Sequence, residues 1–332
     1  MMRLADLTFS DLYVTESPAT SLFKPTGDSL ELKFIPKECW EEHDQLLQEL
    51  MKHKNKSFHV HWPDRDGETA MHMRVENIPT FEDRPVFVCR RFKLGYQPLV
   101  ELGMAHAIVN KLLLKDEFKS GLVIFLGKPG SGKTTTAVAL IIERLKLHGG
   151  VCWTVENPVE LPMQGVHGKG ICFQTEVKDD SEIPERIARF YRGGPNVIFV
   201  GEVRKEPEVK EAILAASSGC LVILTFHSED LLSGLGRFIA MAPSGSEASL
   251  ASSIRAVIHL ELRNKDDRAV GQGIMGNTHG TGSPLRVLAT EPLFFDGQAK
   301  DAIKSVIRSG DLHMLKSEIE RQKRNLMMGN FK

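Results

Sequence analysis

Four short, largely apolar runs in the middle of the chain restrict its fold more than any other feature of the sequence. The runs are Leu122–Leu126, Val151–Val155, Val197–Val200 and Leu221–Phe226. A run without polar alternation is typical of a strand that is buried on both faces. Segments with helical periodicity, such as Thr135–Leu147 and Glu208–Ala216, separate these runs. Alternating buried strands and helices predict an α/β fold with a mostly parallel sheet.

The first hundred residues have a different pattern. Phe58–Trp62 alternates apolar and polar residues, as a half-buried strand does, and a helical pattern follows Pro36. This mixture predicts a small α+β domain over residues 1–94, and Gly95–Pro98 is typical of a linker. The second domain would then span residues 99–332, beginning with a helix from about Leu99 to Leu114.

Toward the C-terminus we expect a helix over Ser249–Val257, then a strand over Ile258–Leu262. Gly271–Gly282 contains five glycines and no apolar period, which predicts a loop. The apolar spacing returns to a helical period in the tail. These C-terminal helices complete the second domain.

Composition narrows the environment in which this chain works. The formal net charge is -1, so no overall charge draws the chain to nucleic acid or to an acidic membrane. The five cysteines are widely spaced and lie partly in apolar runs, as reduced core thiols do. No apolar run approaches the ~20 residues that span a bilayer, and the N-terminus lacks the apolar stretch of a signal peptide. We therefore expect a cytoplasmic protein that reaches membranes only through partners.

One motif predicts nucleotide binding with high specificity. It matches the pattern GxxxxGK[ST] and consists of Gly127, Lys128, Pro129, Gly130, Ser131, Gly132, Lys133 and Thr134, with Thr135 following. It comes directly after a predicted strand and opens a predicted helix, which is the context that the phosphate-binding P-loop requires. Backbone N–H groups and Lys133 would bind the phosphates of ATP, and the hydroxyl of Thr134 would ligate Mg²⁺.

Acidic residues follow two other buried strands, as hydrolysis requires. Glu202 follows the run that ends at Val200 and is a candidate metal ligand beside the P-loop. Glu156 and Glu160 both follow the Val151–Val155 strand, and either could orient and deprotonate the attacking water. Spacing alone does not separate these two.

Histidines provide two further candidates. His227 ends the Leu221–Phe226 strand, where it could hydrogen-bond the γ-phosphate. His59 and His61 would lie on one face of a strand as a possible metal pair, although no third ligand is apparent.

Taken together, these residues resemble the type II/type IV secretion and pilus ATPases, and most closely the pilus-retraction type. The resemblance spans nearly the whole chain. The matching segments are Ser10–Val14 (SDLHL-like), Leu99–Met104 (LEDLGM-like), Thr154–Glu160 (Asp box), Gly201–Arg204 (atypical Walker B ending), Ala215–His227 (His box) and Ala302–Arg308 (AIRNLIRE-like).

This resemblance implies a homohexameric ring, a PAS-like N-terminal domain and a RecA-like ATPase domain. It implies that Glu160 is the catalytic glutamate and that Glu202 is the Walker B glutamate. Arginines from a neighbouring domain or subunit would complete the site, and the candidates are Arg90, Arg91 and Arg204. The expected function is Mg²⁺-dependent ATP hydrolysis that drives a type IV pilus or secretion machine through a platform protein in the inner membrane. The protein would then lie at the cytoplasmic face of that membrane.

Several residues depart from the family pattern. Asn157 replaces the aspartate of the Asp box, Cys220 replaces a histidine of the His box, and Thr175 stands where arginine is usual. These departures favour a divergent branch, such as a plasmid-borne or conjugative (type IVB-like) secretion motor. Two other classes stay open: a RecA-like nucleic-acid motor and a nucleotide-dependent assembly factor that does not hydrolyse ATP. No basic channel loop supports the former, and we expect no direct contact with nucleic acid.

Overall fold

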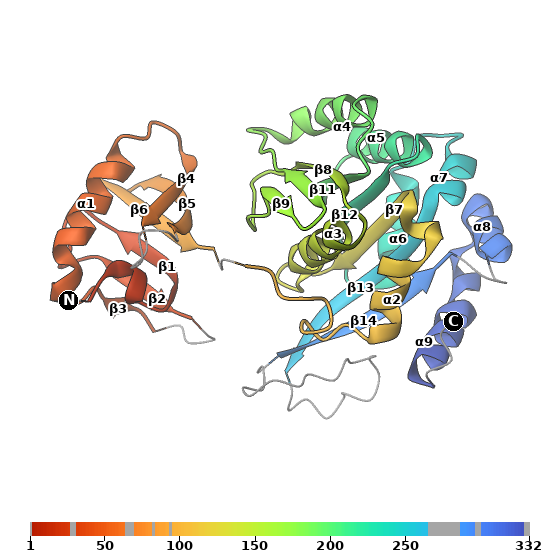
Figure 1. Cartoon of the computed structure of the whole chain (residues 1–332), viewed down its shortest axis with the longest axis horizontal. Helices are drawn as coiled ribbons and strands as arrows, with labels where there is room; N and C mark the ends of the chain where they lie inside the picture. The colour runs from red at the N-terminus through yellow and green to blue at the C-terminus, as the bar shows by residue number, and fades with distance from the viewer. Residues whose placement is uncertain are drawn as a thin grey trace. The chain divides into compact units, whose positions relative to one another are not determined.

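The computed structural model describes residues 2–26, 31–63, 70–81, 84–92, 95–264, 286–295 and 300–328. The chain forms two compact units, Met1–Gly95 and Tyr96–Lys332, which we describe separately (Figure 1). Within the described residues, no helix is both long and apolar enough to cross a membrane.

The first unit is an antiparallel sheet with one long helix. The strand order is β3-β2-β1-β6-β5-β4. Its elements are β1 (Phe9–Val14), β2 (Leu22–Pro25), β3 (Lys33–Phe34), α1 (Trp40–Met51), β4 (Ser57–Pro63), β5 (Ala70–Pro79) and β6 (Pro85–Arg91), with short 3-10 turns at Leu4–Asp6 and Lys37–Cys39. Leu46 and Leu50 of α1 are fully buried in one core with residues of the sheet, including Leu12 and Phe87. The PAS-like assignment of this unit stays a prediction.

The second unit contains an eight-stranded sheet in the order β14-β13-β7-β12-β11-β8-β10-β9. The strands are β7 (Gly121–Gly127), β8 (Gly150–Val155), β9 (Gly165–His167), β10 (Gly170–Phe173), β11 (Val197–Val203), β12 (Leu221–His227), β13 (Ile254–Asn264) and β14 (Arg286–Phe294). The central six are parallel, whereas β9 and β14 pair antiparallel at the two edges. The predicted α/β fold with a mostly parallel sheet is therefore confirmed.

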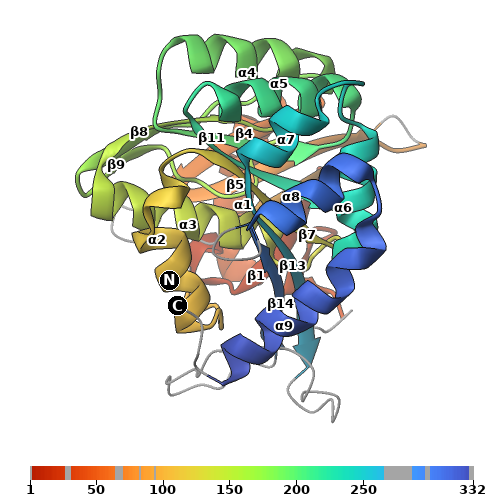
Figure 2. The same ribbon diagram turned by 90° about the vertical axis from the view of Figure 1, so that its right-hand side faces the viewer.

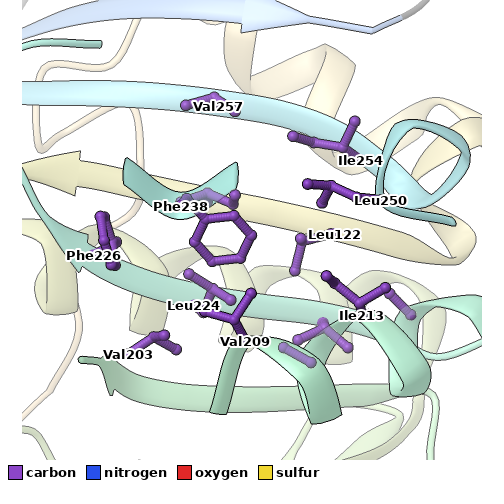
Figure 3. Close-up of a cluster of buried hydrophobic side chains, with 14 of the residues drawn as sticks. Leu122, Val203, Val209, Ile213, Leu224, Phe226, Phe238, Leu250, Ile254 and Val257 are labelled. Atoms are coloured by element: carbon purple, nitrogen blue, oxygen red, sulfur yellow. The ribbon is translucent and has the colours of Figure 1, made fainter. Parts of the chain in front are cut away.

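Helices cover both faces of this sheet (Figure 2). They are α2 (His106–Leu114), α3 (Lys133–His148), α4 (Ile183–Arg192), α5 (Glu206–Ser217), α6 (Leu231–Ala240), α7 (Glu247–Ser253), α8 (Lys300–Ser309) and α9 (Leu315–Met327). Alternate residues of β7 point to opposite faces: Val123 and Phe125 pack with α2 and α3, whereas Leu122 and Ile124 pack with α4 to α8. Figure 3 shows part of the core on the face of Leu122 and Ile124, where Phe238 of α6 lies against Leu224 and Phe226 of β12.

The parallel strands bring their C-terminal ends to the same edge of the sheet. Gly127, Val155, Val203 and His227 end neighbouring strands there, in the spatial order β7-β12-β11-β8. In open parallel sheets this is the edge at which ligands bind. The motif residues of the sequence therefore lie on the correct edge for a shared site.

Two predicted helices have different bounds in the structure. The helix expected from Leu99 begins at His106, because Leu99–Met104 forms turns, with Gly103 at a φ of +99° and the Leu99 N–H bonded to Glu143. The helix expected over Ser249–Val257 ends at Ser253, because pairing with β7 draws Ile254 and the residues after it into β13. The predicted loop over Gly271–Gly282 lies outside the described residues.

Cysteine usage matches the sequence prediction. All five cysteines are buried and unpaired. Burial raises the pKa of the Cys89 thiol far above its ordinary value, so this group stays protonated. These thiols pack as small apolar side chains.

Candidate nucleotide site

The P-loop joins β7 to α3 through glycines that no other residue could replace without strain. Gly127, Gly130 and Gly132 all have positive φ angles, of 151°, 74° and 88°. A Cβ on Gly127 would also collide with the Ser131 hydroxyl and the Leu260 carbonyl. The loop can therefore turn tightly enough to aim successive N–H groups at an anion ahead of the α3 N-terminus.

Lys133, the first residue of α3, folds back onto this loop. Its Nζ donates hydrogen bonds to the carbonyls of Gly127 and Lys128, both at 2.9 Å. Burial lowers the pKa of Lys133, while Glu202 and Glu160 act in the opposite direction. The side chain is thus a buried cation held between neutral carbonyls and two acids.

Ser131 carries a second sign of a ligand site in the loop. Its Oγ is buried and has no hydrogen-bond partner within the part of the chain that the structure describes. Buried polar groups without a partner are rare in folded proteins. The donor set of this loop fits a phosphate, which would supply the missing acceptor. Thr134 is half-buried and Thr135 exposed in the first turn of α3.

The sequence predicted that Glu202 follows the strand, but in the structure it lies within β11. The strand continues to Val203 because its pairing with β12 resumes there after a register shift that begins at Val200. The Glu202 carboxylate accepts a hydrogen bond from Arg204 Nε at 2.9 Å. The other end of the Arg204 guanidinium donates to Asp180 at 3.0 Å, so Arg204 is shared between two acids.

The two glutamates after β8 have very different surroundings. Glu156 is almost fully buried and its Oε1 accepts a hydrogen bond from Gln174 Nε2 at 2.8 Å. Burial raises the pKa of Glu156 to about 7, although hydrogen bonds, including one from the backbone of Glu160, counteract this. Glu160 itself is exposed and close enough to influence Lys133. Glu156 is therefore enclosed and hydrogen-bonded, whereas Glu160 is exposed and acts electrostatically on the P-loop lysine.

His227 ends β12 directly opposite Gly127 in the strand register. Its Nδ1 lies 3.0 Å from the Gly127 carbonyl oxygen. A carbonyl can only accept, so Nδ1 carries the proton in this contact. The Arg237 guanidinium lies over the Phe226 ring and donates to the His227 carbonyl at 3.3 Å, which fixes the strand end.

Comparison with known proteins agrees with this geometry. The family described as "Type II/IV secretion system protein" matches residues 56–302, about three quarters of the chain. The chain belongs to this family.

Curated members of the secretion family align over different shares of their length. The type IV pilus ATPase PilU of Pseudomonas aeruginosa is 27% identical over 94% of this chain and 77% of its own. The type II secretion protein HxcR of the same organism is 28% identical, over 77% of this chain but only 59% of its own length. The match therefore spans about three quarters of the length of PilU and about three fifths of that of HxcR.

Solved structures of similar fold include a pilus motor and an ATPase. The pilus retraction motor PilT, crystallised with ADP, superposes with a TM-score of 0.73 at 23% identity, covering 98% of this chain and 92% of PilT. The Legionella pneumophila ATPase DotB gives a TM-score of 0.67 at 19% identity, covering 95% and 84%. At these identities the likeness concerns the fold.

The two candidate arginines in the first unit of this secretion-family chain, Arg90 and Arg91, differ in how firmly their side chains are held. Arg91 donates to the carbonyls of Ala5 and Leu7 at 3.1 and 3.0 Å and lies over the Phe9 ring, so it is bound inside its own unit. The Arg90 side chain pairs with Asp11 at 2.8 Å but remains 66% exposed. Arg90 is therefore the better placed of the two to reach another molecule.

The two histidines considered as a metal pair, His59 and His61, each lie against another ring. His61 lies against His72 of β5 with ring centroids 4.1 Å apart, whereas His59 stacks on Phe92. Among the described residues, no group of three or more His, Cys, Asp or Glu side chains could hold a metal ion.

Sequence reasoning missed two features beside the P-loop. One is Asp180, whose pairing with Arg204 spans 24 residues and brings the turn ahead of α4 to the residue that follows β11. The other is a cavity of 460 Å³ between Lys128–Ser131 and His259–Arg263, with Glu229. Neither has a local motif, because both depend on strand order.

Proposed function

We propose that this chain is an ATP-hydrolysing motor subunit of a pilus or secretion machine. The observation that carries the proposal is the meeting of functional groups from the ends of three strands beside one P-loop. Glu202 and Glu160 both act on the Lys133 ammonium group, and His227 contacts the carbonyl of Gly127. These groups are far apart in the sequence, so the fold itself assembles a set that suits phosphoryl transfer to water.

Binding of ATP would use the loop as it stands. The N–H groups of the loop and the Ser131 hydroxyl would meet phosphate oxygens, and Lys133 would exchange two neutral carbonyls for charged oxygens. Hydrogen bonds between charged partners are roughly twice as strong as neutral ones, so the exchange is favourable. Within the P-loop, phosphate binding would therefore reorganise one side chain and little backbone.

Thr134 and Glu202 are the residues that would hold Mg²⁺. When bound with ATP, this ion offsets negative charge that develops on the phosphates. Glu202 now pairs with Arg204, and it would have to release that partner. Because Arg204 also binds Asp180, its charge keeps an acidic partner when Glu202 turns away.

Glu160 is the residue that we assign as general base. It is exposed at the site and can meet a water molecule, whereas Glu156 is buried and hydrogen-bonded. His227 would sense the γ-phosphate through Nε2, because Nδ1 is engaged with the Gly127 carbonyl. Glu156 would then have a structural role, because its carboxyl accepts a hydrogen bond from the backbone of Glu160.

Family membership supports the wider role. We propose a homohexameric ring that acts on a platform protein at the cytoplasmic face of the inner membrane and drives pilus retraction or secretion. Arg90 from a neighbouring unit would complete each site. A conjugative secretion motor of the same family is the second candidate, favoured by the departures at Asn157, Thr175 and Cys220.

ATP turnover by the purified full-length chain tests the proposal. Release of phosphate from Mg²⁺-ATP should fall at least about 100-fold in Lys133→Ala, because a buried cation at the phosphates is lost. Lys119→Ala is the matched control, since this exposed lysine pairs only with Asp116 on a surface turn. Equal turnover in wild type and Lys133→Ala would rule out the P-loop as the hydrolytic site, and an inactive wild type would favour the assembly factor.

A further inference from the structure

A continuous chain of side chains connects the two acidic segments of the proposed site. Asn157 Nδ2 donates to Asp180 Oδ1 at 2.7 Å. Asp180 Oδ2 accepts from Arg204 at 3.0 Å, and Arg204 in turn donates to Glu202. These contacts connect the segment that ends in Glu160 to the strand that carries Glu202. The carboxylate of Asp180, which belongs to neither element, joins them.

Asp180 lies at the start of a short turn, Asp180–Glu182, ahead of α4. Its side chain is 18% exposed and that of Arg204 is 50% exposed, so water partly screens the contact between them. The pKa of Arg204 is affected first by burial, which lowers it, but the contacts with Asp180 and Glu202 more than compensate and raise it. Asp180 is therefore held by two hydrogen bonds, one from Asn157 and one from Arg204.

The residue type at position 157 follows from this partner. An aspartate there would place a second carboxylate at the 2.7 Å contact with Asp180, where two negative charges repel. The nearby position 175 holds threonine, whose hydroxyl donates to the Thr154 carbonyl and carries no charge that could offset another acid. Asparagine supplies the N–H donor that Asp180 needs.

Other contacts fix the rest of the segment that carries the base. The N–H of Val159 donates to Glu176 at 2.8 Å, and the backbone of Glu160 hydrogen-bonds to the Glu156 carboxyl. Among the side chains of residues 157–160, Asn157 is the one for which the structure gives a hydrogen bond to Asp180, which in turn binds Arg204 just after β11. It is therefore placed to set the segment in register with Glu202.

We propose that Asp180 is a positioning residue that holds the Glu160 segment and Arg204 together through Asn157. The inference rests on the proposed ATPase function, because its consequence is the alignment of the base with the metal-binding edge. Asp180 itself touches no substrate. Its second role is to keep Arg204 paired while Glu202 changes partner.

Exchange of the two residues tests this proposal. Asn157→Asp and Asp180→Asn should each lower kcat at least tenfold with KM for ATP changed less than threefold, because base and metal edge lose alignment while the P-loop is intact. The double variant should recover to within threefold of wild type. In it, the amide at 180 can donate to the acid at 157 and still accept from Arg204 through its oxygen.

Asp179→Asn is the matched control. This neighbouring acid only caps the same turn, where its Oδ1 accepts from the Ser181 N–H at 2.8 Å, and asparagine caps equally well. Turnover of the control should equal that of wild type. If it fell as far as that of Asp180→Asn, Asp180 would have no specific role in positioning.

Melting temperatures of the same variants, measured without nucleotide, test the contact between residues 157 and 180 independently of turnover. Each single exchange should lower the melting temperature, and the double variant should regain most of the loss. Additive losses in melting temperature, or a double variant with no recovery in kcat, would overturn the inference. A wild type that binds ATP without turnover would refute the proposed function, while the melting cycle would still decide whether Asn157 and Asp180 are coupled.

Discussion

At the residue scale, burial decides which of two glutamates after β8 can act on water. Glu156 loses solvent and gains a hydrogen bond from Gln174, whereas Glu160 keeps its solvent access. Spacing could not separate them, because both follow the same strand. The distinction depends on Gly201 and Gln174, which come from β11 and from the segment after β10 and close over Glu156 alone.

The raised pKa of Glu156 has a measurable effect on stability. Its ordinary pKa is 4.5 and burial raises the folded value to about 7, so the folded state binds more protons than the unfolded state between these values. The free energy of unfolding should therefore fall as pH rises from 4.5 to 7, by about 3 kcal/mol from this group.

Glu156→Gln isolates that contribution, because the amide is neutral and its oxygen can still accept from Gln174. Urea unfolding of the variant and the wild type should give a difference in stability that moves in favour of the variant as pH rises to 7, then stays constant. A difference that does not change with pH would contradict the buried, protonated state.

At the element scale, the sequence predicted the buried strands well because continuous apolar runs have few other uses. It failed where tertiary contacts override a local period. Leu99–Met104 has helical spacing but forms turns, and Ile254 leaves a helical pattern to pair with β7. The short hairpin of β9 and β10 was also missed, since three- and four-residue strands leave no period.

Helix α8 is the element that we expect to transmit motion. Ile303 and Ile307 are buried and fix it to the core, while Arg308 is exposed. Lys304 is half-buried and thus less exposed than Arg308. Burial, followed by the charges of Lys300 and Arg255, lowers the pKa of Lys304.

The double variant Lys304→Ala/Arg308→Ala should keep ATP turnover within about threefold of wild type, because neither side chain belongs to the site, yet abolish pilus or secretion function in cells. Lys316→Ala/Arg324→Ala on α9 removes the same charge and should keep both. A proportional loss of turnover and cellular function in the α8 variant would assign the helix a structural role only.

At the scale of the whole molecule, the proposed ring makes a prediction about shared sites. Arg90 is exposed in the first unit, whereas Arg91 is bound to Ala5 and Leu7, so Arg90 is the residue to substitute. Because Arg90 pairs with the buried Asp11, the melting temperature of the variant should first establish that this unit stays folded. Arg90→Ala and Lys133→Ala proteins should each be inactive, because one lacks a charge that stabilises the transition state and the other lacks phosphate binding.

Mixing these two proteins under conditions that exchange subunits should restore turnover, since some interfaces then combine an intact Arg90 with an intact Lys133. Size measurements would establish that the rings persist. Persistent inactivity at every mixing ratio, with rings intact, would exclude sharing of Arg90 between subunits.

The central claim is that one edge of the sheet hydrolyses ATP with Glu160 as the base. The most direct test compares phosphate release by Glu160→Gln and Glu156→Gln in the full-length protein, with nucleotide binding measured alongside. Glu160→Gln should bind ATP as wild type does and lose about 10²–10⁴-fold in turnover, because a neutral amide cannot accept the proton. Glu156→Gln should keep most of its activity. Turnover that survives in Glu160→Gln but disappears in Glu156→Gln would contradict the account.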